Sequence, residues 1–254
     1  MPQPIPFLGR AHESERLNRA FRSGEPLLLL GPRGCGKTRL IQEALAVNPR
    51  VLYVAWAPTL HALLTAMARG LLGARHAEFA RRAAASADGF SPPPADPEAW
   101  LSAQTSLHLK GLLWTAMEKS PVPMVLDGIA GAGFPTYRFL QRIYHTRGMA
   151  LFAAARDVPS LGALARLFWN PAQALSIPPL SAHDAGQLFE AAATHFGLRS
   201  LDLATFRDKT LESAHGNPGQ IIEMCRLATE PQYRAGRQIK FSPLRIDTVM
   251  KFGA

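Results

Sequence analysis

An apolar run, a glycine-rich stretch and a helical pattern follow one another directly, and this order constrains the fold more than any other feature of the sequence. Residues 26–30 read Pro-Leu-Leu-Leu-Leu, residues 31–38 read Gly-Pro-Arg-Gly-Cys-Gly-Lys-Thr, and residues 38–46 place apolar side chains at helical spacing. The middle stretch matches the pattern G-x-x-x-x-G-K-[ST] in full. Its glycines allow the backbone angles that turn successive N–H groups toward an anion at a helix N-terminus. The sequence therefore predicts a phosphate-binding loop between a buried strand and a helix.

The residues of this loop have separate predicted roles in holding a nucleotide. Lys37 is predicted to act catalytically by placing its ammonium group against the β- and γ-phosphates, and the Thr38 hydroxyl is predicted to bind Mg²⁺. We expect Arg33 to point outward and Cys35 to act as a small spacer rather than as a reactive thiol. The nucleotide-binding residues expected in and beside the loop are Gly31, Arg33, Gly34, Cys35, Gly36, Lys37, Thr38 and Arg39. ATP or ADP with Mg²⁺ is the cofactor that this set predicts.

Four more apolar runs of strand length follow along the chain, at residues 50–56, 122–127, 149–154 and 174–178. Helical patterns separate them, most clearly at residues 60–72 and 134–145. Runs that are apolar throughout are typical of strands buried on both faces, and their alternation with helices favours a parallel sheet. The predicted fold class is α/β: a parallel five-stranded P-loop sheet of the additional-strand type with helices on both faces, followed by a small helical subdomain.

The sequence after Pro179 predicts helices only, which sets the expected domain boundaries. Ser181 reads as the N-cap of a helix that runs to His195, and further helices are expected at residues 203–214 and 219–229. We predict a nucleotide-binding α/β core at residues 1–180, a helical lid at residues 181–230 and a docked C-terminal tail at residues 231–254. Within the sequence of the α/β core domain, a proline-rich stretch at residues 86–98 is expected to form a surface loop.

A second site residue is expected at the end of the third apolar run. Asp127 closes the run from Val122 to Leu126, so we expect it at the exposed end of a strand, where it would hold Mg²⁺ and contribute to catalysis. The alternative is a turn aspartate that precedes Gly128. A complete phosphate loop elsewhere in the chain favours the metal-binding interpretation.

Together these motifs resemble the AAA+ and STAND branch of the additional-strand P-loop ATPases, in particular the archaeal-type and replication-initiator-like members. The resemblance spans residues 5–230 and rests on the order of its motifs. These are Phe7-Leu-Gly-Arg10 followed by Glu13, Glu15 and Leu17, the phosphate loop, Asp127, Arg156 after the fourth strand, Ile177-Pro-Pro-Leu-Ser181, and Gly216-Asn-Pro218.

The resemblance implies roles for residues outside the loop. Leu8, Gly9 and Pro218 are expected to clasp the adenine, and Arg156 occupies the position of the family's first sensor residue. Ring-forming members place an arginine finger where this chain has Arg166, and the alternative for this residue is a solvated helix arginine.

Two departures from the family pattern bear on hydrolysis. The acid that normally follows the metal-binding aspartate is replaced by Gly128, and the arginine expected after the Gly-Asn-Pro motif is replaced by Gly219-Gln220. A general base commonly contributes ~10²–10⁴ in rate. ATP hydrolysis to ADP and phosphate is therefore expected to be slow unless Asp127, Asp157 or a partner supplies this help.

Charge and composition extend the hypotheses to partners and location. The net charge of +9 makes double-stranded DNA a candidate partner, although most of the basic residues are arginines spread along the chain, as an arginine-rich composition alone would give. The two cysteines are too few for a disulfide framework, no apolar run reaches the ~20 residues of a membrane span, and no secretory leader is visible, so we expect a cytoplasmic protein that binds no membrane.

The leading functional hypothesis is an ATP-dependent switch or assembly regulator that acts through a protein partner, a second copy of the chain or DNA. It resembles the helper ATPases of transposition and replication, and a defence-type STAND module is also compatible. The main alternative is a P-loop kinase of small molecules or nucleosides, which would need an acid or an arginine pair after the second strand. A scaffold with a degenerate nucleotide site is a third class, which the complete Gly36-Lys37-Thr38 argues against.

Overall fold

A computed structural model describes residues 4–86, 96–146 and 150–253 of the chain. The chain divides into two compact units. The sheet unit comprises Ser14–Leu30 and Ile41–Ser176, and the helical unit comprises Met1–Glu13, Gly31–Leu40 and Ile177–Ala254. The phosphate loop therefore belongs to the same unit as the C-terminal helices.

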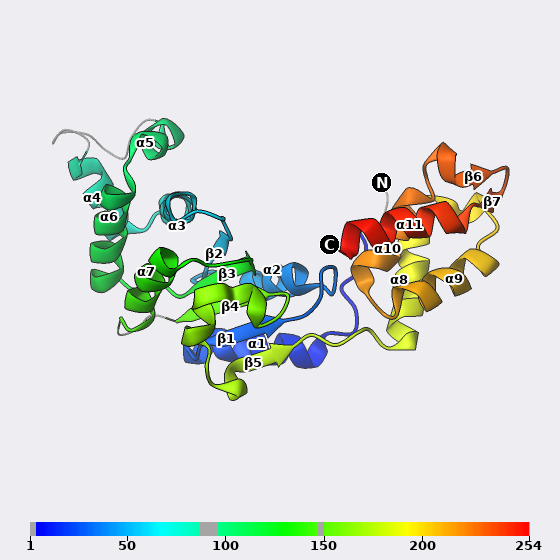
Figure 1. Cartoon of the computed structure of the whole chain (residues 1–254), viewed down its shortest axis with the longest axis horizontal. Helices are drawn as coiled ribbons and strands as arrows, with labels where there is room; N and C mark the ends of the chain where they lie inside the picture. The colour runs from blue at the N-terminus through cyan, green and yellow to red at the C-terminus, as the bar shows by residue number, and fades with distance from the viewer. Residues whose placement is uncertain (1–3, 87–95, 147–149, 254) are drawn as a thin grey trace. The chain divides into compact units, whose positions relative to one another are not determined.

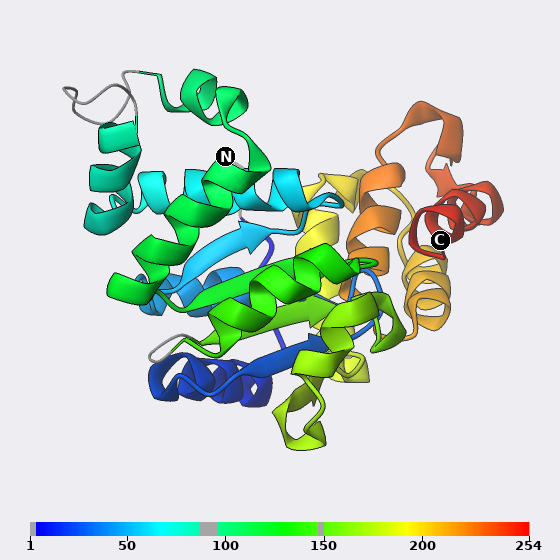
Figure 2. The ribbon, with the colours of Figure 1, turned by 60° about the vertical axis from the view of Figure 1, so that its left-hand side comes forward.

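A parallel sheet forms the centre of the sheet unit (Figures 1 and 2). Its five strands within the described residues are β1 (Leu27–Leu30), β2 (Leu52–Ala55), β3 (Met124–Ile129), β4 (Leu151–Ala155) and β5 (Ala174–Ser176), in the order β2-β3-β4-β1-β5. Every pairing in the sheet is parallel, and β4 lies between β1 and β3. The predicted fold class, with its additional strand, is confirmed.

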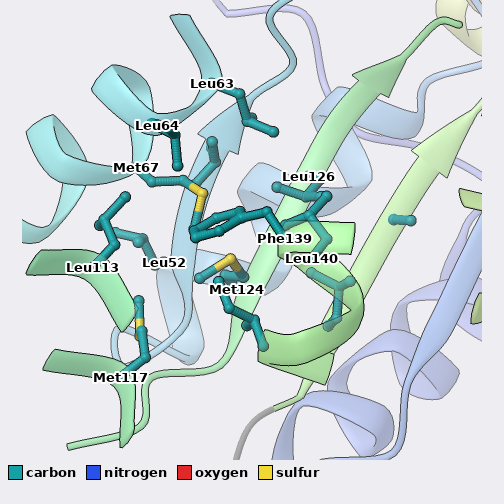
Figure 3. Packing of buried hydrophobic residues seen from close by; sticks show 14 of the residues in the cluster. Leu52, Leu63, Leu64, Met67, Leu113, Met117, Met124, Leu126, Phe139 and Leu140 are labelled. Atoms are coloured by element: carbon teal, nitrogen blue, oxygen red, sulfur yellow. The ribbon is translucent and has the colours of Figure 1, made fainter. Parts of the chain in front are cut away.

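One face of this sheet is covered by an extensive hydrophobic core (Figure 3). Alternate strand residues such as Leu52, Met124 and Leu126 point into it, as the two-residue period of a strand requires. The core is completed by α3 (Leu60–Gly73), α4 (Ala77–Ser86), α5 (Pro97–Ala103), α6 (Ser106–Lys119), α7 (Phe134–Tyr144) and the 3₁₀ segment η1 (Pro159–Leu167). Each buried leucine stabilises such a core by about 1.5–3 kcal/mol relative to an exposed one.

The residues between these alternate positions point to the opposite face. Phe152 lies there and packs edge to face against Phe21 of α1 (Ala11–Ser23), with ring centroids 4.6 Å apart. Helices therefore pack on both faces, and strands between them must be apolar throughout. This explains why β1 and β4 read as unbroken apolar runs.

Several helices of the sheet unit were not expected from the sequence. Three of them are α1, α4 and α5, and the 3₁₀ segment η2 (Pro171–Gln173) is another short addition. The proline-rich loop expected at residues 86–98 lies mostly outside the described residues. At its described ends, Ser86 closes α4, and Asp96 caps α5, whose first residue is Pro97.

The helical unit has its own core, built mainly by three helices after residue 180. These are α8 (Ala182–His195), α9 (Ala204–Ala214) and α10 (Pro218–Leu227), with α8 and α10 packed side by side (Figure 1). Ser181 caps α8 through the Asp184 N–H, as expected. The short η3 (Leu198–Ser200) lies between α8 and α9.

The C-terminal residues form more structure than the predicted tail. The segment η4 (Pro231–Tyr233) leads into a small hairpin of β6 (Arg234–Ala235) and β7 (Gln238–Ile239), followed by α11 (Phe241–Phe252). The hairpin corrects the expectation of helices alone after Pro179. Tyr233 and Leu244 are buried in the core of the helical unit, which fixes this segment there. The predicted domain boundaries at residues 180 and 230 stay predictions.

Candidate functional site

The loop at residues 31–38 has the backbone of an anion-binding cradle. Gly34 and Gly36 have φ angles of +84° and +100°, which residues with a side chain rarely adopt. Helix α2 (Lys37–Val47) begins inside the loop. The N–H groups of a helix's first turn have no acceptor within the helix and carry the positive end of its dipole. Phosphate oxygens bind favourably at helix N-termini of this kind.

Two residues at the start of α10 form hydrogen bonds with this loop. The Asn217 side-chain amide donates to the Arg33 carbonyl at 2.9 Å, and the Gly219 N–H donates to the Gly34 carbonyl at 2.9 Å. The Asn217 side-chain oxygen also caps α10 by accepting from the N–H groups of Gly219 and Gln220. One asparagine therefore fixes both the start of a helix and one edge of the loop.

A buried arginine ties down the next peptide of the loop. Arg10, only 4% exposed, donates to the Cys35 carbonyl at 3.1 Å. The carbonyls of three consecutive loop residues are thus hydrogen-bonded to groups outside the loop, which fixes the orientation of their peptide planes. This lowers the entropy that the loop loses when it orders around a ligand.

The packing around Gly34 leaves no room for a side chain. A Cβ at Gly34 would lie 2.6 Å from the Asn217 side-chain oxygen and 2.6 Å from Cε1 of Phe252, at the end of α11. A Cβ at Gly219 would lie 2.7 Å from Cα of Gly34. Glycine is required here by close approach as well as by backbone angle.

Lys37 bonds to the loop itself. Its Nζ donates to the Gly31 carbonyl at 2.6 Å and to the Pro32 carbonyl at 3.1 Å, and it lies 3.7 Å from Sγ of the buried Cys35. Thr38 and the exposed Arg39 follow on the first turn of α2. Arg33 is exposed, as expected of a side chain that points outward.

An apolar cavity of about 180 Å³ lies beside the loop within the helical unit. Its walls come from the entry segment, the loop, and helices α8 and α10: Pro6, Phe7, Leu8, Arg10, Gly34, Cys35, Gly36, Arg39, Leu180, Leu188, Pro218, Gly219 and Ile222. Leu8 and Pro218 thus face one cavity. Gly9 is absent from its described lining, and a Cβ at Gly9, where φ is +64°, would lie 2.7 Å from a carboxylate oxygen of Asp184.

Asp127 lies in the sheet unit, where its environment differs from the predicted exposed strand end. Strand β3 continues to Ile129, and Asp127 is only 7% exposed. The Tyr53 hydroxyl of β2 donates to Oδ2 of Asp127 at 3.0 Å. Burial, with added contributions from the charge and the hydrogen bond of Asp127, raises the pKa of Tyr53 to about 12. The phenol therefore stays protonated and remains a donor at neutral pH.

Gly128 changes the backbone as well as the side chain at the position of the missing acid. The register between β3 and β4 shifts between Asp127 and Ile129, and Gly128 has a φ of +80°. The residue thus forms a bulge in the strand, in a conformation that favours glycine. No described atom lies within 4 Å of a Cβ built there, so space does not limit this position.

The residues after β4 form a small polar turn. Arg156 is exposed and pairs with Asp157 at 3.2 Å. Ser160 donates its hydroxyl at 2.5 Å and its N–H at 2.8 Å to Asp157, and these bonds, led by the hydroxyl, lower the pKa of Asp157. Asp157 is thus an ionised acceptor held by its neighbours.

Arg166 is exposed on η1. Its guanidinium carbon lies 5.9 Å from the centroid of the Tyr137 ring on α7.

Sequence reasoning assigned no role to three contributors to these arrangements, although it quoted Asn217 within the Gly216-Asn-Pro218 motif. Asn217 had a readable signal, because asparagine directly before a proline at a helix start is a typical N-cap. Tyr53 and Phe252 had none, since each contact joins residues from different elements.

A strand, a glycine-rich loop and a helix in this order, with strand order β2-β3-β4-β1-β5, define the class of P-loop nucleotide-binding folds. The chain belongs to the AAA ATPase domain family, whose sequence profile matches residues 6–154. The resemblance found from the sequence motifs is therefore confirmed at the level of the family.

Solved structures of the same fold include archaeal proteins of several kinds. The Orc1 protein of Aeropyrum pernix, in complex with DNA, matches 98% of this chain and 66% of its own at 16% identity and a TM-score of 0.61. The Walker-type ATPase of Pyrococcus abyssi matches over 98% and 73% at 14% identity and a TM-score of 0.60. A STAND protein with a tetratricopeptide repeat sensor from Pyrococcus horikoshii matches over 98% and 33% at 15% identity and a TM-score of 0.56. At these identities the likeness concerns the fold.

A curated relative matches over a short stretch only. The denitrification regulatory protein NirQ of Pseudomonas aeruginosa is 61% identical over 43 residues, which is 16% of this chain and 16% of NirQ. Separately, none of the helices in residues 4–86, 96–146 and 150–253 is long and apolar enough to cross a membrane.

Proposed function

We propose that the chain binds ATP with Mg²⁺ and works as a nucleotide-dependent switch or assembly regulator that hydrolyses ATP slowly. The pair of hydrogen bonds from Asn217 and Gly219 to the carbonyls of Arg33 and Gly34 carries this proposal. These bonds join the phosphate loop to α10, so a change in the loop on binding or release of the γ-phosphate changes the support of that helix. In this function residues 181–230 act as the lid.

The hydrogen-bond donors of the loop are suited to a nucleoside triphosphate. The first-turn N–H groups of α2 and the Lys37 ammonium are suited to phosphate oxygens, and Lys37 exchanges its present loop-carbonyl partners for phosphate on binding. The apolar cavity with Leu8 and Pro218 in its walls suits a flat heteroaromatic base. Gly9, which turns the chain beside Leu8 with a φ of +64°, is the third residue of this proposed adenine clasp.

The residues assigned to the metal have the oxygen chemistry that Mg²⁺ prefers. The Thr38 hydroxyl is the proposed direct ligand, and the Asp127 carboxylate accepts from a metal-bound water. When bound, Mg²⁺ neutralises charge on the phosphates. The part of this chain is to hold that charge with Lys37 and to fix the orientation of the carboxylate.

Slow hydrolysis follows from the described side chains near the strand ends. Gly128 supplies no base, and Asp157 is already engaged by Ser160 and Arg156. We propose Arg156 as the sensor and Arg166 as a residue that acts on a neighbouring copy of the chain. Arg166 is exposed, as such a role requires.

Double-stranded DNA is the proposed macromolecular partner, alongside a protein partner that reads the switch. The net charge of +9 supports an anionic partner, and the Aeropyrum pernix Orc1 structure of the same fold is a complex with DNA. Binding through phosphate contacts would weaken steeply as salt is raised. An affinity for DNA that stays flat with salt would contradict this part of the proposal.

Phosphate release from Mg·ATP, measured with and without double-stranded DNA beside a direct ATP-binding measurement, tests the whole proposal. Binding with slow release is the expected result, and faster release with DNA would make DNA the activating partner. Absence of ATP binding would overturn the proposal, and fast release without any partner would overturn the switch with slow turnover.

A further inference from the structure

The alternation along β2 and β3 places Tyr53 and Asp127 on one face of the sheet. Leu52 and Val54 of β2 and Leu126 of β3 point into the core under α3 and α7, where Figure 3 labels Leu52 and Leu126. The residues between them therefore point to the opposite face. Tyr53 pairs in register with Val125, two positions before the pair of Ala55 and Asp127, so its long side chain must extend along the strand to reach the carboxylate.

The contact between the two side chains is a defined hydrogen bond. The Tyr53 hydroxyl donates to Oδ2 of Asp127 at 3.0 Å, with Asp127 buried and Tyr53 37% exposed. An ionised carboxylate has about four acceptor sites, and the Tyr53 phenol occupies one of them. A hydrogen bond to Oδ2 restricts the rotation of the carboxylate and so helps to set the direction in which its oxygens point.

The Tyr53 phenol, which comes from β2, differs in charge from the acid that the family carries directly after its metal-binding aspartate. A second carboxylate would add a negative charge, whereas the neutral phenol adds a donor that stabilises the charge already present. Position 128 is a glycine in a bulge and provides no side chain. Tyr53 therefore orients the Asp127 carboxylate, whereas position 128 offers no acid that could activate a water.

We propose that Tyr53 is a positioning residue for metal-dependent nucleotide binding, which it supports by holding Asp127 in the orientation that receives the metal's water. This inference rests on the proposed function, because it assumes that Mg·ATP is the ligand. Groups that orient the ligands of a metal site typically change metal affinity 10–100-fold when removed.

The test is a titration of MgCl₂ at fixed fluorescent ATP analogue, on the full chain and on Tyr53→Phe. We expect the Mg²⁺ concentration for half-maximal binding to rise about tenfold in the variant, with the metal-free affinity measured in EDTA unchanged. A merely structural tyrosine would lower the melting temperature and leave the Mg²⁺ midpoint in place, and that result would overturn the inference.

The chain offers a matched control for the loss of a tyrosine–aspartate hydrogen bond. The Tyr233 hydroxyl donates to Asp247 in the helical unit, outside the proposed metal ligands. Tyr233→Phe removes the same kind of bond and is expected to leave the Mg²⁺ midpoint unchanged. An equal shift in both variants would overturn a specific role for Tyr53.

Asp127→Asn extends the test to the residue through which Tyr53 acts. In this background, Tyr53→Phe is expected to cause no further shift of the Mg²⁺ midpoint, since the two side chains act as one unit. A full additional tenfold shift would contradict the inference. Wild-type protein that binds no nucleotide at any Mg²⁺ concentration would overturn the proposed function itself. Wild-type binding with an unshifted Tyr53→Phe midpoint overturns only the role of Tyr53.

Discussion

The phosphate loop at residues 31–38 and the strand end around Asp127 differ in how closely each follows the family pattern. The loop matches its motif in full, and its carbonyls are held by Arg10, Asn217 and Gly219. The strand end keeps the aspartate but has a glycine bulge and a tyrosine donor beside it. The comparison supports the proposal of a protein that binds a nucleotide and hydrolyses it slowly.

Lys37→Ala tests the loop side with the largest expected effect. Removing the ammonium should lower ATP affinity by at least ~100-fold, because no other charge of the loop replaces its contact with phosphate. The fold should persist, since the lost bonds involve carbonyls of the loop itself. Calorimetric titration measures the affinity, with exposed Lys209→Ala as the control. Unchanged ATP affinity in Lys37→Ala would refute the assignment of the loop.

Gly34→Ala tests whether the loop depends on close packing as well as on its motif. The new Cβ combines a left-handed backbone with contacts at 2.6 Å, so we expect a loss of about 2–4 kcal/mol in the free energy of unfolding together with weaker ATP binding. Gly236→Ala is the control, because Gly236 has a φ of +62° and no described atom within 4 Å of its Cβ position. For Gly236→Ala, urea unfolding should show a loss of about 1–2 kcal/mol in the free energy of unfolding. Equal losses would mean that packing by Asn217 and Phe252 adds nothing.

Gly128→Glu tests the strand end by restoring the acid of the family pattern. At a φ of +80° the glutamate is strained, so the free energy of unfolding should fall by about 1–2 kcal/mol. Because the bulge redirects the residue, phosphate release should stay far below the ~10²-fold gain of a working base. Gly128→Asn should lose less stability, since asparagine tolerates this conformation better. A large gain in turnover would show that only the side chain was missing.

Glu223→Gln tests the support that α10 and α11 give to each other, and through Phe252 to the loop. Glu223 accepts from Arg226 of its own helix and from Lys251 of α11, both at 2.9 Å, and these partners, led by Arg226, lower its pKa. We expect Glu223→Gln to lower the free energy of unfolding by about 1–2 kcal/mol at pH 7. Glu230→Gln is the control, because Glu230 pairs with the same arginine at a more exposed site, 34% against 10% for Glu223. Glu230→Gln should lower the free energy of unfolding by less than about 1 kcal/mol.

The pH dependence of this variant gives the sign of the effect. Since the pKa of Glu223 in the fold lies below its ordinary value of 4.5, the charged pairing stabilises the fold fully above that value. The contribution is lost as pH falls below 4.5 through the lowered pKa. The stability difference between wild type and Glu223→Gln should therefore shrink in acid, and a difference that stays constant to low pH would exclude the charge as its cause.

The sequence by itself determined the sheet, the loop and most helices, because their patterns are local. Apolar runs placed all five strands to within a few residues, the motif placed the loop and the start of α2, and Ser181 placed the start of α8. The helices α1, α4, α5 and α11 were not expected. The roles of the individual site residues stay predictions.

Only the tertiary structure decided how the two regions are supported. Tyr53 meets Asp127 across 74 positions of sequence, Asn217 meets Arg33 across 184, and Phe252 packs against Gly34. The bulge at Gly128 depends on the register between β3 and β4, which the sequence of β3 alone does not contain. Such contacts arise when separate elements pack, and local patterns carry no information about which side chains will then meet.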